Sequence, residues 1–316
     1  QILIIERQNM KIFKHRGDIY ISKSSGKKSR EEHILLIMLA IIVIFTVVFF
    51  AILSQKYSSV KEFFAGDSVT VTQQANNGVE ELPQISGKSN FLIIETDEEE
   101  SVIHFAFLVQ ADKDTPSYKV CTLSPNTDID GQSLYDLYSL GGGATIQTKL
   151  TAYLGINIDY YAALKTDDFI EFVNKLGTYI YPSDEAIKFN NDNPDDKYSV
   201  RIGTGEQKLS GSETSDLLRY YSNENVNYAK ANQIILYGLT ELFNAENFDN
   251  AEAIFRLFIN SATTNITVRN FQDNIDAIEV FCKKNSDIAV YSATVKYKSN
   301  VLTPKSVQEI KGYFSE

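Results

Sequence analysis

The sequence has few of the residues that build the commonest covalent and catalytic centres. It holds only two cysteines, Cys121 and Cys282, which is too few for a disulfide-stapled small domain or a structural zinc site. They can pair in an oxidising compartment, or they can lie buried as two small hydrophobic side chains, and burial is the favoured interpretation. Beyond residue 53 the sole histidine is His104, and no Gly-x-Ser-x-Gly motif accompanies it. This scarcity argues against a hydrolase built on a Ser-His-Asp triad.

Arginine and glycine-rich motifs are also scarce. Because arginine binds phosphate through a forked pair of N–H groups, a chain with few arginines has difficulty clamping a pyrophosphate. The glycine run at 141–143 has neither the Walker lysine nor the dinucleotide fingerprint, and it predicts a simple turn before a helix. The acidic clusters at 97–100 and 192–196 lack calcium-loop spacing and are predicted to be solvated loops. The arginines beyond residue 53 are Arg201, Arg219, Arg256 and Arg269.

One long hydrophobic segment is present. Residues 34–53 are twenty consecutive residues without a charge, enough to cross a ~30 Å hydrocarbon core at ~1.5 Å per residue. A cleaved signal peptide would have a shorter apolar run and a small-residue cleavage site, which residues 51–54 do not resemble. We therefore predict a retained transmembrane helix at 34–53.

The charge distribution predicts the orientation of this helix. Residues 1–33 hold eight basic and four acidic side chains, which leaves 22 basic and 37 acidic residues for the rest of the chain. The net charges are therefore +4 and −15. Since the basic end stays in the cytoplasm, we expect a single-pass protein of the cell membrane with its main domain outside the cytoplasm. An acidic domain gives no support to nucleic-acid binding.

The chain after the predicted span divides into a linker and one domain. Residues 54–88 predict a juxtamembrane helix followed by a polar linker. Residues 89–316 predict a three-layer α/β/α domain, because strand-like runs that are apolar on both faces alternate with amphipathic helices. The expected strands are 91–94, 102–109, 118–123 and 291–297, and the expected helical faces are 169–176, 231–242, 251–259, 271–282 and a last helix opened by Pro304.

Between Asn90 and about residue 245, a series of short motifs resembles the LytR-CpsA-Psr family. Their order carries more information than any one of them. The matching segments are Glu95-Thr96-Asp97, Thr122-Leu123-Ser124-Pro125-Asn126-Thr127, Leu154-Gly155-Ile156, Ile158-Asp159-Tyr160-Tyr161, Phe169 to Gly177, Gly205-x-Gln207-x-Leu209-x-Gly211-x-Glu213 and Leu217-Leu218-Arg219-Tyr220-Tyr221.

The resemblance implies a central sheet between helices and a long apolar cavity for the polyprenyl chain of a lipid-linked glycopolymer. Active members of the family transfer the glycopolymer phosphate to peptidoglycan, with magnesium held by acids and several arginines around the pyrophosphate. Carried onto this chain, the candidates are Arg219 and Lys230 for catalysis, Asp97 and His104 for Mg²⁺, and Tyr160, Tyr220, Tyr221 and Tyr228 for the cavity.

The sequence departs from the family pattern at the charged positions. Pro125 and Asn126 stand where the family has an arginine and an aspartate, and His104 replaces the second metal-binding acid. Of the later basic pattern, only Arg219 and Lys230 keep a positive charge. We interpret the chain as a degenerate member with a doubtful need for Mg²⁺.

Each candidate also has a purely structural interpretation. Arg219 can bind a phosphate, or it can pair with Glu213 or Asp216 on its own helix. Asp97 can hold a metal or cap a turn at a strand end, and His104 can replace a metal ligand or be a hydrogen-bonded strand histidine. The tyrosines can line a cavity or simply pack in the core.

Three functions remain open at this level. The leading hypothesis is a cell-envelope protein of a Gram-positive-type bacterium that binds a polyprenyl-linked glycopolymer or a wall-assembly partner with weak or no catalysis. The second is an active glycopolymer phosphotransferase rebuilt around Asp97, Arg219 and Lys230. The third is an extracytoplasmic adaptor whose acidic surface recruits proteins and whose cavity is filled by its own side chains.

Overall fold

The computed structural model describes residues 82–193 and 196–315. The predicted cytoplasmic tail at 1–33 and the predicted transmembrane helix at 34–53 lie outside these residues, as does most of the predicted linker. Among the described residues, no helix is long and apolar enough to span a bilayer. Residues 82–87, the last part of the predicted linker, form neither helix nor strand before β1 begins.

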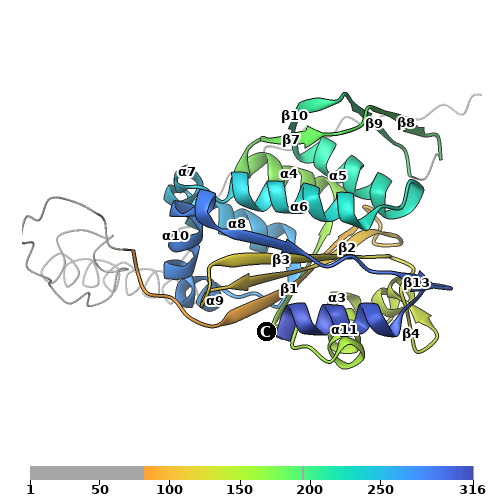
Figure 1. Cartoon of the computed structure of the whole chain (residues 1–316), viewed down its shortest axis with the longest axis horizontal. Coiled ribbons are helices and arrows are strands. Elements are labelled where there is room, and N and C mark those ends of the chain that lie inside the picture. The colour runs from red at the N-terminus through yellow and green to blue at the C-terminus, as the bar shows by residue number, and fades with distance from the viewer. Residues whose placement is uncertain (1–81, 194–195, 316) are drawn as a thin grey trace, which may run out of the picture. The chain divides into compact units, whose positions relative to one another are not determined.

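A six-stranded mixed sheet forms the centre of the domain (Figure 1), in the order β11-β6-β1-β2-β3-β12. Strands β1, β2 and β3 form an antiparallel meander, which confirms the strands predicted at 91–94, 102–109 and 118–123. Strand β6 is parallel to β1, β12 is parallel to β3, and β11 is antiparallel to β6. The bounds are β1 Lys88–Thr96, β2 Ile103–Asp112, β3 Ser117–Leu123, β6 Tyr160–Lys165, β11 Thr263–Thr264 and β12 Ala289–Ser292.

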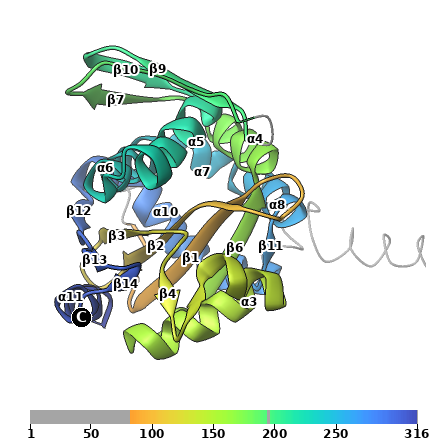
Figure 2. The ribbon, with the colours of Figure 1, turned by 90° about the vertical axis from the view of Figure 1, so that its right-hand side faces the viewer.

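Both faces of this sheet are covered by helices, as Figures 1 and 2 show. Along β2, Phe105 and Phe107 belong to one hydrophobic cluster, whereas Ala106 and Leu108 belong to the other. This alternation is the period of two expected for a strand, and the strand reads as continuously apolar because both faces are buried. The mixed α/β fold expected from the sequence is confirmed.

Two helices cover one face of the sheet. The helices between residues 166 and 283 cover the other face (Figure 2). The first face carries α3 (Leu134–Leu154) and α11 (Pro304–Ser315), and the start of α11 at Pro304 is as predicted. The second carries α4 (Thr166–Leu176), α5 (Gly211–Arg219), α6 (Tyr228–Leu242), α7 (Ala245–Asp249), α8 (Ala251–Ser261), α9 (Val268–Asp273) and α10 (Ile275–Lys283).

Short elements that the sequence did not predict surround these layers. The hairpin of β8 and β9 and the antiparallel pair of β7 and β10 that flanks it in sequence lie outside α4, α5 and α6 (Figures 1 and 2). Their strands are β7 Tyr179–Ser183, β8 Ile187–Asn191, β9 Tyr198–Ile202 and β10 Gly205–Leu209. The others are β4 Asp128–Ile129 with β5 Gln132–Ser133, β13 Tyr297–Lys298 with β14 Val301–Leu302, the π-helix η1 Tyr220–Glu224 and the 3₁₀ turn η2 Asn285–Asp287.

The strand predicted at 291–297 is wrong in its extent. Strand β12 ends at Ser292, because the next pairing position on β3 is taken by a side chain from α6. Asn232 accepts the Thr122 backbone N–H at 2.7 Å and donates to the Ala293 carbonyl oxygen at 2.9 Å. A buried amide therefore replaces the ladder.

Two other predictions change in detail. The helical face at 271–282 is divided by Asn274 into α9 and α10. The glycine run at 141–143 is not a turn before a helix but a kink inside α3, where Gly142 has a φ of 64°. A Cβ at Gly143 would lie 2.5 Å from the Tyr161 ring, so the kink also lets this helix approach β6 closely.

Cys121 and Cys282 are both buried and both free. The predicted interpretation as small hydrophobic side chains is confirmed. Burial raises the pKa of each thiol, which keeps both groups protonated and unreactive.

Gly211 allows α5 to pack against α4, and this generates a stability prediction. A Cβ at Gly211 would overlap the Ile170 carbonyl oxygen, whereas a Cβ at Gly312 in α11 meets nothing within 4 Å. We expect Gly211→Ala to lower the free energy of unfolding by about 1–3 kcal/mol through overpacking. The matched change Gly312→Ala should raise it by up to about 1 kcal/mol through helix propensity. Urea unfolding of both variants measures this, and equal effects would contradict the packing argument.

Candidate functional site

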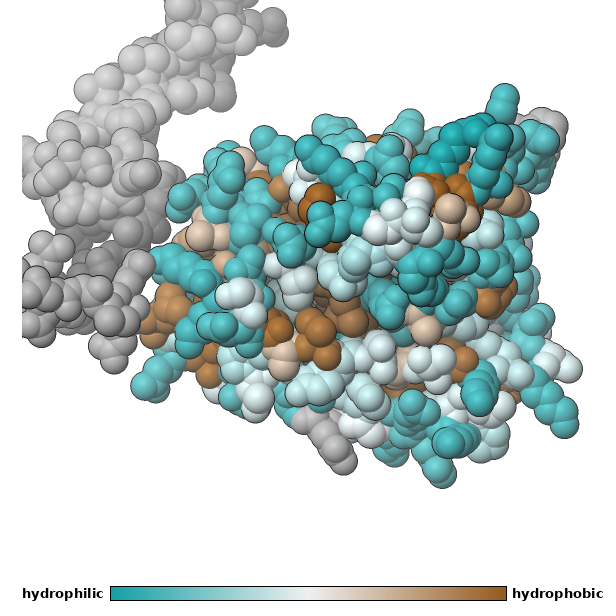
Figure 3. Space-filling model, turned by 45° about the horizontal axis from the view of Figure 1, so that its top comes forward, coloured by the Kyte–Doolittle hydropathy of each residue, from teal (hydrophilic) through white to brown (hydrophobic). Residues whose placement is uncertain are grey.

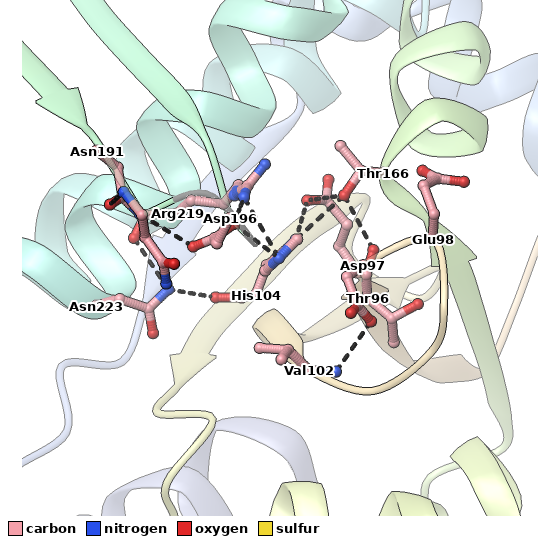
Figure 4. A network of polar contacts seen from close by, with 12 residues as sticks. Thr96, Asp97, Glu98, Val102, His104, Thr166, Asn191, Asp196, Arg219 and Asn223 are labelled. Atoms are coloured by element: carbon pink, nitrogen blue, oxygen red, sulfur yellow. Dashed lines mark hydrogen bonds and ion pairs between the residues drawn. The ribbon is translucent and has the colours of Figure 1, made fainter.

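A cluster of polar side chains lies where β1 ends (Figure 4). Strands β1 and β6 are parallel, so their carboxyl ends share one edge of the sheet, and the hairpin from β1 brings the start of β2 to the same edge. Helix α4 begins there directly after β6, and α5 lies across it. This topology brings together side chains that are up to 120 residues apart in sequence.

Glu95 is the centre of the cluster and is fully buried. The Ser215 hydroxyl on α5 lies 3.0 and 2.9 Å from the two carboxyl oxygens, and Thr166 on α4 lies 3.3 Å from one of them. Burial raises the pKa of Glu95 to about 8, and the Ser215 hydrogen bond and the Arg219 charge oppose that shift only in part. Glu95 is therefore an uncharged acid at neutral pH. Sequence analysis did not single it out.

His104 lies beside Glu95 and is also buried. Its Nδ1 is 3.2 Å from a Glu95 oxygen and 3.1 Å from the Thr166 hydroxyl, and its Nε2 is 3.3 Å from the Arg219 guanidinium. Burial, followed by the Arg219 charge, lowers the pKa of His104 to about 4. The interpretation as a hydrogen-bonded strand histidine is confirmed, and the ring is neutral.

Arg219 is buried at the end of α5 and points toward the same cluster. Its guanidinium forms an ion pair with Asp196 and lies 4.4 Å from the centre of the Tyr198 ring. Burial lowers the pKa of Arg219, although nearby acids oppose the shift. The predicted pairing with Glu213 or Asp216 is wrong, because Glu213 caps its own helix and the partner comes from the segment before β9.

The prediction of a solvated acidic loop at 192–196 is wrong for Asp196, because this residue reaches the buried arginine. The backbone around Arg219 is also unusual, since α5 continues directly into the π-helix η1. Asn223 in η1 donates to the carbonyl oxygens of His104 and Arg219 at 2.7 and 3.1 Å. Single π-turns of this kind occur often at functional sites.

Asp97 has a structural role at the turn between β1 and β2. Its carboxylate accepts hydrogen bonds from the Ser101 N–H at 2.6 Å, the Ser101 hydroxyl at 2.5 Å and the Val102 N–H at 2.9 Å. Partial burial alone would raise the pKa of Asp97, but these hydrogen bonds lower it. The interpretation as a strand-end turn residue is confirmed.

The donor set at this site does not fit a magnesium ion. Mg²⁺ prefers several free oxygen ligands in octahedral geometry, whereas the Asp97 oxygens close a turn and His104 offers only nitrogen. In the described part of the chain, no group of three or more His, Cys, Asp or Glu side chains is placed to hold a metal ion.

Lys230, the second candidate for catalysis, has different neighbours. It lies on α6 and forms an ion pair with Asp184, which follows β7. Within residues 82–193 and 196–315 it has no hydrogen bond or ion pair with Arg219, Asp97 or His104. The two basic candidates therefore have different acidic partners, Asp184 for Lys230 and Asp196 for Arg219.

The segment with proline and asparagine in place of charged residues folds into a closed turn. The Asn126 N–H donates to the Ser124 hydroxyl at 3.1 Å, and the Thr127 N–H donates to the Ser124 carbonyl oxygen at 2.9 Å. The Ser124 N–H donates to the Tyr297 hydroxyl at 2.9 Å. Pro125 is buried, so this turn offers no positive charge to a phosphate.

The candidate tyrosines do not share one location. Tyr160 stacks on Phe91 with ring centres 5.2 Å apart and lines a large cavity. Tyr220 packs against Phe189 outside that cavity, at a ring distance of 5.1 Å. The Tyr221 hydroxyl donates to Glu185 at 2.7 Å.

Tyr228 lies on the other side of the sheet from Tyr160. It contacts the cluster beneath α3 and α11, and its ring centre is 5.6 Å from that of Tyr297. Of the four tyrosines, therefore, only Tyr160 is among the residues that line the cavity.

That cavity has a volume of about 400 Å³ and lies between the sheet and the helices of the second face. Its volume is within the ~300–1,000 Å³ range of small-molecule sites. In the described structure, Lys113 is the sole charged residue on its wall, and its ammonium group donates to the Asn274 side chain at 3.0 Å. Ten phenylalanines line the cavity: Phe91, Phe107, Phe169, Phe172, Phe243, Phe248, Phe255, Phe258, Phe271 and Phe281.

Residues after 245, to which the sequence assigned no role, form much of this wall. Helices α7, α8, α9 and α10 gather at one end of the sheet (Figure 1) and contribute half of the ten phenylalanines. Figure 3 shows hydrophobic residues reaching the surface in a band on this side of the domain. The spacing of these phenylalanines predicted helices, but it did not reveal that the helices enclose a space.

Comparison with known proteins gives one family and one curated relative. A model described as the LytR_cpsA_psr family matches residues 118–312. The relative is an uncharacterised protein of Staphylococcus aureus (strain NCTC 8325 / PS 47), which is 24% identical over 183 residues. The match covers 56% of this chain and 44% of the relative, so the chain spans less than half the length of the curated protein that it matches.

Solved structures with the same fold have low sequence identity. A Eubacterium siraeum protein provisionally described as a transcription regulator has a TM-score of 0.63 at 15% identity, covering 76% of this chain and 98% of its own. B. subtilis TagV has a TM-score of 0.55 at 15% identity, covering 73% and 97%. TagT bound to LI-WTA has a TM-score of 0.51 at 13% identity, covering 75% and 93%.

The burial of Glu95 generates a pH prediction. The folded state keeps the Glu95 proton up to about pH 8, whereas the unfolded chain releases it near 4.5. The unfolded state therefore binds fewer protons between these values, and the free energy of unfolding falls as pH rises. Glu95→Gln removes this contribution. We expect the stability of the variant relative to the wild type to rise by on the order of 5 kcal/mol across this window.

Urea unfolding at several pH values measures this difference. Asp216, whose pKa is raised to about 7 by burial and next by the Glu95 charge, titrates in both proteins, so the difference between them reports Glu95 together with its effect on Asp216. The exposed Glu99→Gln is the matched control, and its free energy of unfolding should differ from that of the wild type by the same amount at every pH. If the free energies of unfolding of Glu95→Gln and the wild type changed in parallel with pH, Glu95 would be charged in the folded state.

Proposed function

The chain belongs to the LytR_cpsA_psr family, and on this premise we propose that it binds a polyprenyl-linked cell-wall glycopolymer with little or no transfer of it. The observation that carries the proposal is the cavity of about 400 Å³ with a wall of phenylalanine side chains. An isoprenoid chain is apolar along its whole length. It therefore gains free energy by leaving water for such a cavity.

A second support is the arrangement of the cavity and the polar cluster. Thr214 and Leu218 on α5 line the cavity, and Ser215 and Arg219 on the same helix belong to the cluster. A lipid chain whose phosphate-bearing end lies at this end of the cavity would have its phosphate near Arg219. TagT, a protein of the same fold, was solved bound to LI-WTA.

The departures from the family pattern support weak or absent transfer. Transfer of a phosphate group needs several positive charges that stabilise the transition state. Here Pro125 and Asn126 lie in a closed turn, and Lys230 pairs with Asp184 away from Arg219. One buried arginine binds a phosphate more readily than it accelerates the transfer of one.

The proposal includes an anchor in the cell membrane at residues 34–53, with the described domain outside the cytoplasm. This location would place the cavity where lipid-linked wall polymers are assembled. The adaptor hypothesis has less support, because it expected a cavity filled by the protein's own side chains.

A change at the cavity wall tests the binding proposal. Ala251 lines the cavity at the start of α8, whereas Ala253 on the same helix is exposed and lies outside it. We expect Ala251→Phe to lower the amount of co-purifying polyprenyl phosphate at least about fivefold, because the ring takes up space that the lipid needs. Ala253→Phe should keep the wild-type amount.

Native mass spectrometry of the protein purified from a bacterial membrane fraction measures this amount, and thermal unfolding shows that both variants fold. A wild-type protein without lipid would refute the binding proposal. Magnesium-dependent turnover of the bound glycopolymer, lost in Arg219→Ala, would instead establish the phosphotransferase.

A further inference from the structure

Two acids beside the Arg219–Asp196 ion pair, Asp97 and Glu95, are already committed to protein donors. Both oxygens of Asp97 accept hydrogen bonds within the turn that follows β1. Both oxygens of Glu95 are bonded to Ser215, and the residue has no exposed surface. A divalent cation would have to break these hydrogen bonds before it met a free oxygen of Asp97 or Glu95, and it would have to displace Arg219 or Asn191 from the oxygens of Asp196.

Both ring nitrogens of His104 are committed as well. Nε2 of His104 lies 3.2 Å from the Asp196 carboxylate and 3.3 Å from the Arg219 guanidinium. Its Nδ1 lies 3.2 Å from a Glu95 oxygen and 3.1 Å from the Thr166 hydroxyl. A metal ion at either nitrogen would displace these partners, and at Nε2 it would lie against a permanent positive charge.

From these contacts we infer that Arg219 takes the place of the divalent cation at this site, so that the chain recognises the phosphate-bearing end of its ligand without a metal. The inference rests on the proposed function, because it concerns the head of the same lipid. A guanidinium remains protonated at all physiological pH values and is the side chain best suited to a buried anion site.

Asp196 marks where such a phosphate would bind. Of the two polar side chains on the Arg219 guanidinium, Asp196 has a side-chain exposure of 28%, against 5% for His104. It comes from the connection between β8 and β9 and is the partner that solvent reaches. Its carboxylate occupies the position of an anionic ligand, so an incoming phosphate would displace it.

Arg219 also has one N–H donor that no described residue accepts from. Its Nε–H is buried and has no hydrogen-bond partner among the described residues. Asp196 contacts only Nη2 and leaves this donor unused, whereas a phosphate bound in bidentate geometry accepts from both nitrogens. This unpaired donor gives phosphate an advantage over Asp196.

The test compares two probes with the same lipid chain, farnesyl phosphate and farnesol, on the full chain in detergent. Binding is measured by calorimetry with magnesium chloride and with EDTA. We expect the affinity for farnesyl phosphate to differ by less than about twofold between the two conditions. A tenfold gain with magnesium would overturn the inference.

Variants assign the phosphate recognition to Arg219. Arg219→Ala should lower the affinity for farnesyl phosphate about tenfold or more and leave the affinity for farnesol unchanged, because only the phosphate contacts the guanidinium. Asp196→Asn should raise the affinity for farnesyl phosphate several-fold, because it removes the competing charge. The exposed Asp192→Asn is its control and should leave the affinity unchanged. Equal weakening of both probes in Arg219→Ala would show a merely structural arginine and overturn the inference.

Two further outcomes are distinguishable. If neither probe binds the wild type, the proposed function fails and the inference fails with it. If farnesol and farnesyl phosphate bind the wild type equally, the cavity function stands and the role of Arg219 is refuted. A rise in the unfolding temperature of the unliganded wild type with magnesium alone would also contradict the inference.

Discussion

The fold and the site both depend on the buried carboxyl group of Glu95. It lies at the end of β1 and contacts Ser215 on α5, Thr166 on α4 and His104 on β2. A buried acid is tolerated only where hydrogen bonds satisfy it, so these contacts fix how two helices lie across the edge of the sheet. The same two helices carry Arg219 and part of the cavity wall. The position of the arginine relative to the cavity therefore follows from one protonated carboxyl group.

The cavity, in contrast, lowers the stability of the fold, because its apolar walls have no protein contacts on one side. A sealed and empty cavity of this size would cost on the order of 10 kcal/mol at about 24 cal/mol per Å³, which is comparable to the whole stability of a domain. The helices α7 to α10 nevertheless stand away from the sheet, with phenylalanine rings facing the space. Such an arrangement is stable only when water or an apolar ligand occupies the space. The aromatic wall favours the ligand.

The sequence predicted the parts of the fold whose signal is local. Strands β1 to β3 are apolar runs, and α4, α6 and α8 have clear amphipathic faces, so these elements were found. The end of β12 depends on Asn232 from α6, and no local pattern contains that contact. At the site, Asp97, His104 and Arg219 were singled out one by one. Glu95 was missed because β1 is buried on both faces, and no alternation in its sequence shows that this carboxyl group faces the cluster. Asp196 was missed because it lies in a run of acids that resembles a solvated loop.

In the proposed function, recognition without a metal and the retention of a lipid cavity are physically compatible. Binding needs interactions with the ground state only, whereas transfer needs interactions that become stronger in the transition state. The apolar wall can hold a lipid chain without any charge, and Arg219 adds one fixed positive charge for its head. The additional cations that would stabilise a transferred phosphate are not gathered around Arg219 in the described structure, because Lys230 pairs elsewhere and Pro125 is neutral. A domain with the proposed function would keep the affinity of its family for a lipid-linked ligand while its capacity for chemistry declines, since the two properties depend on different residues.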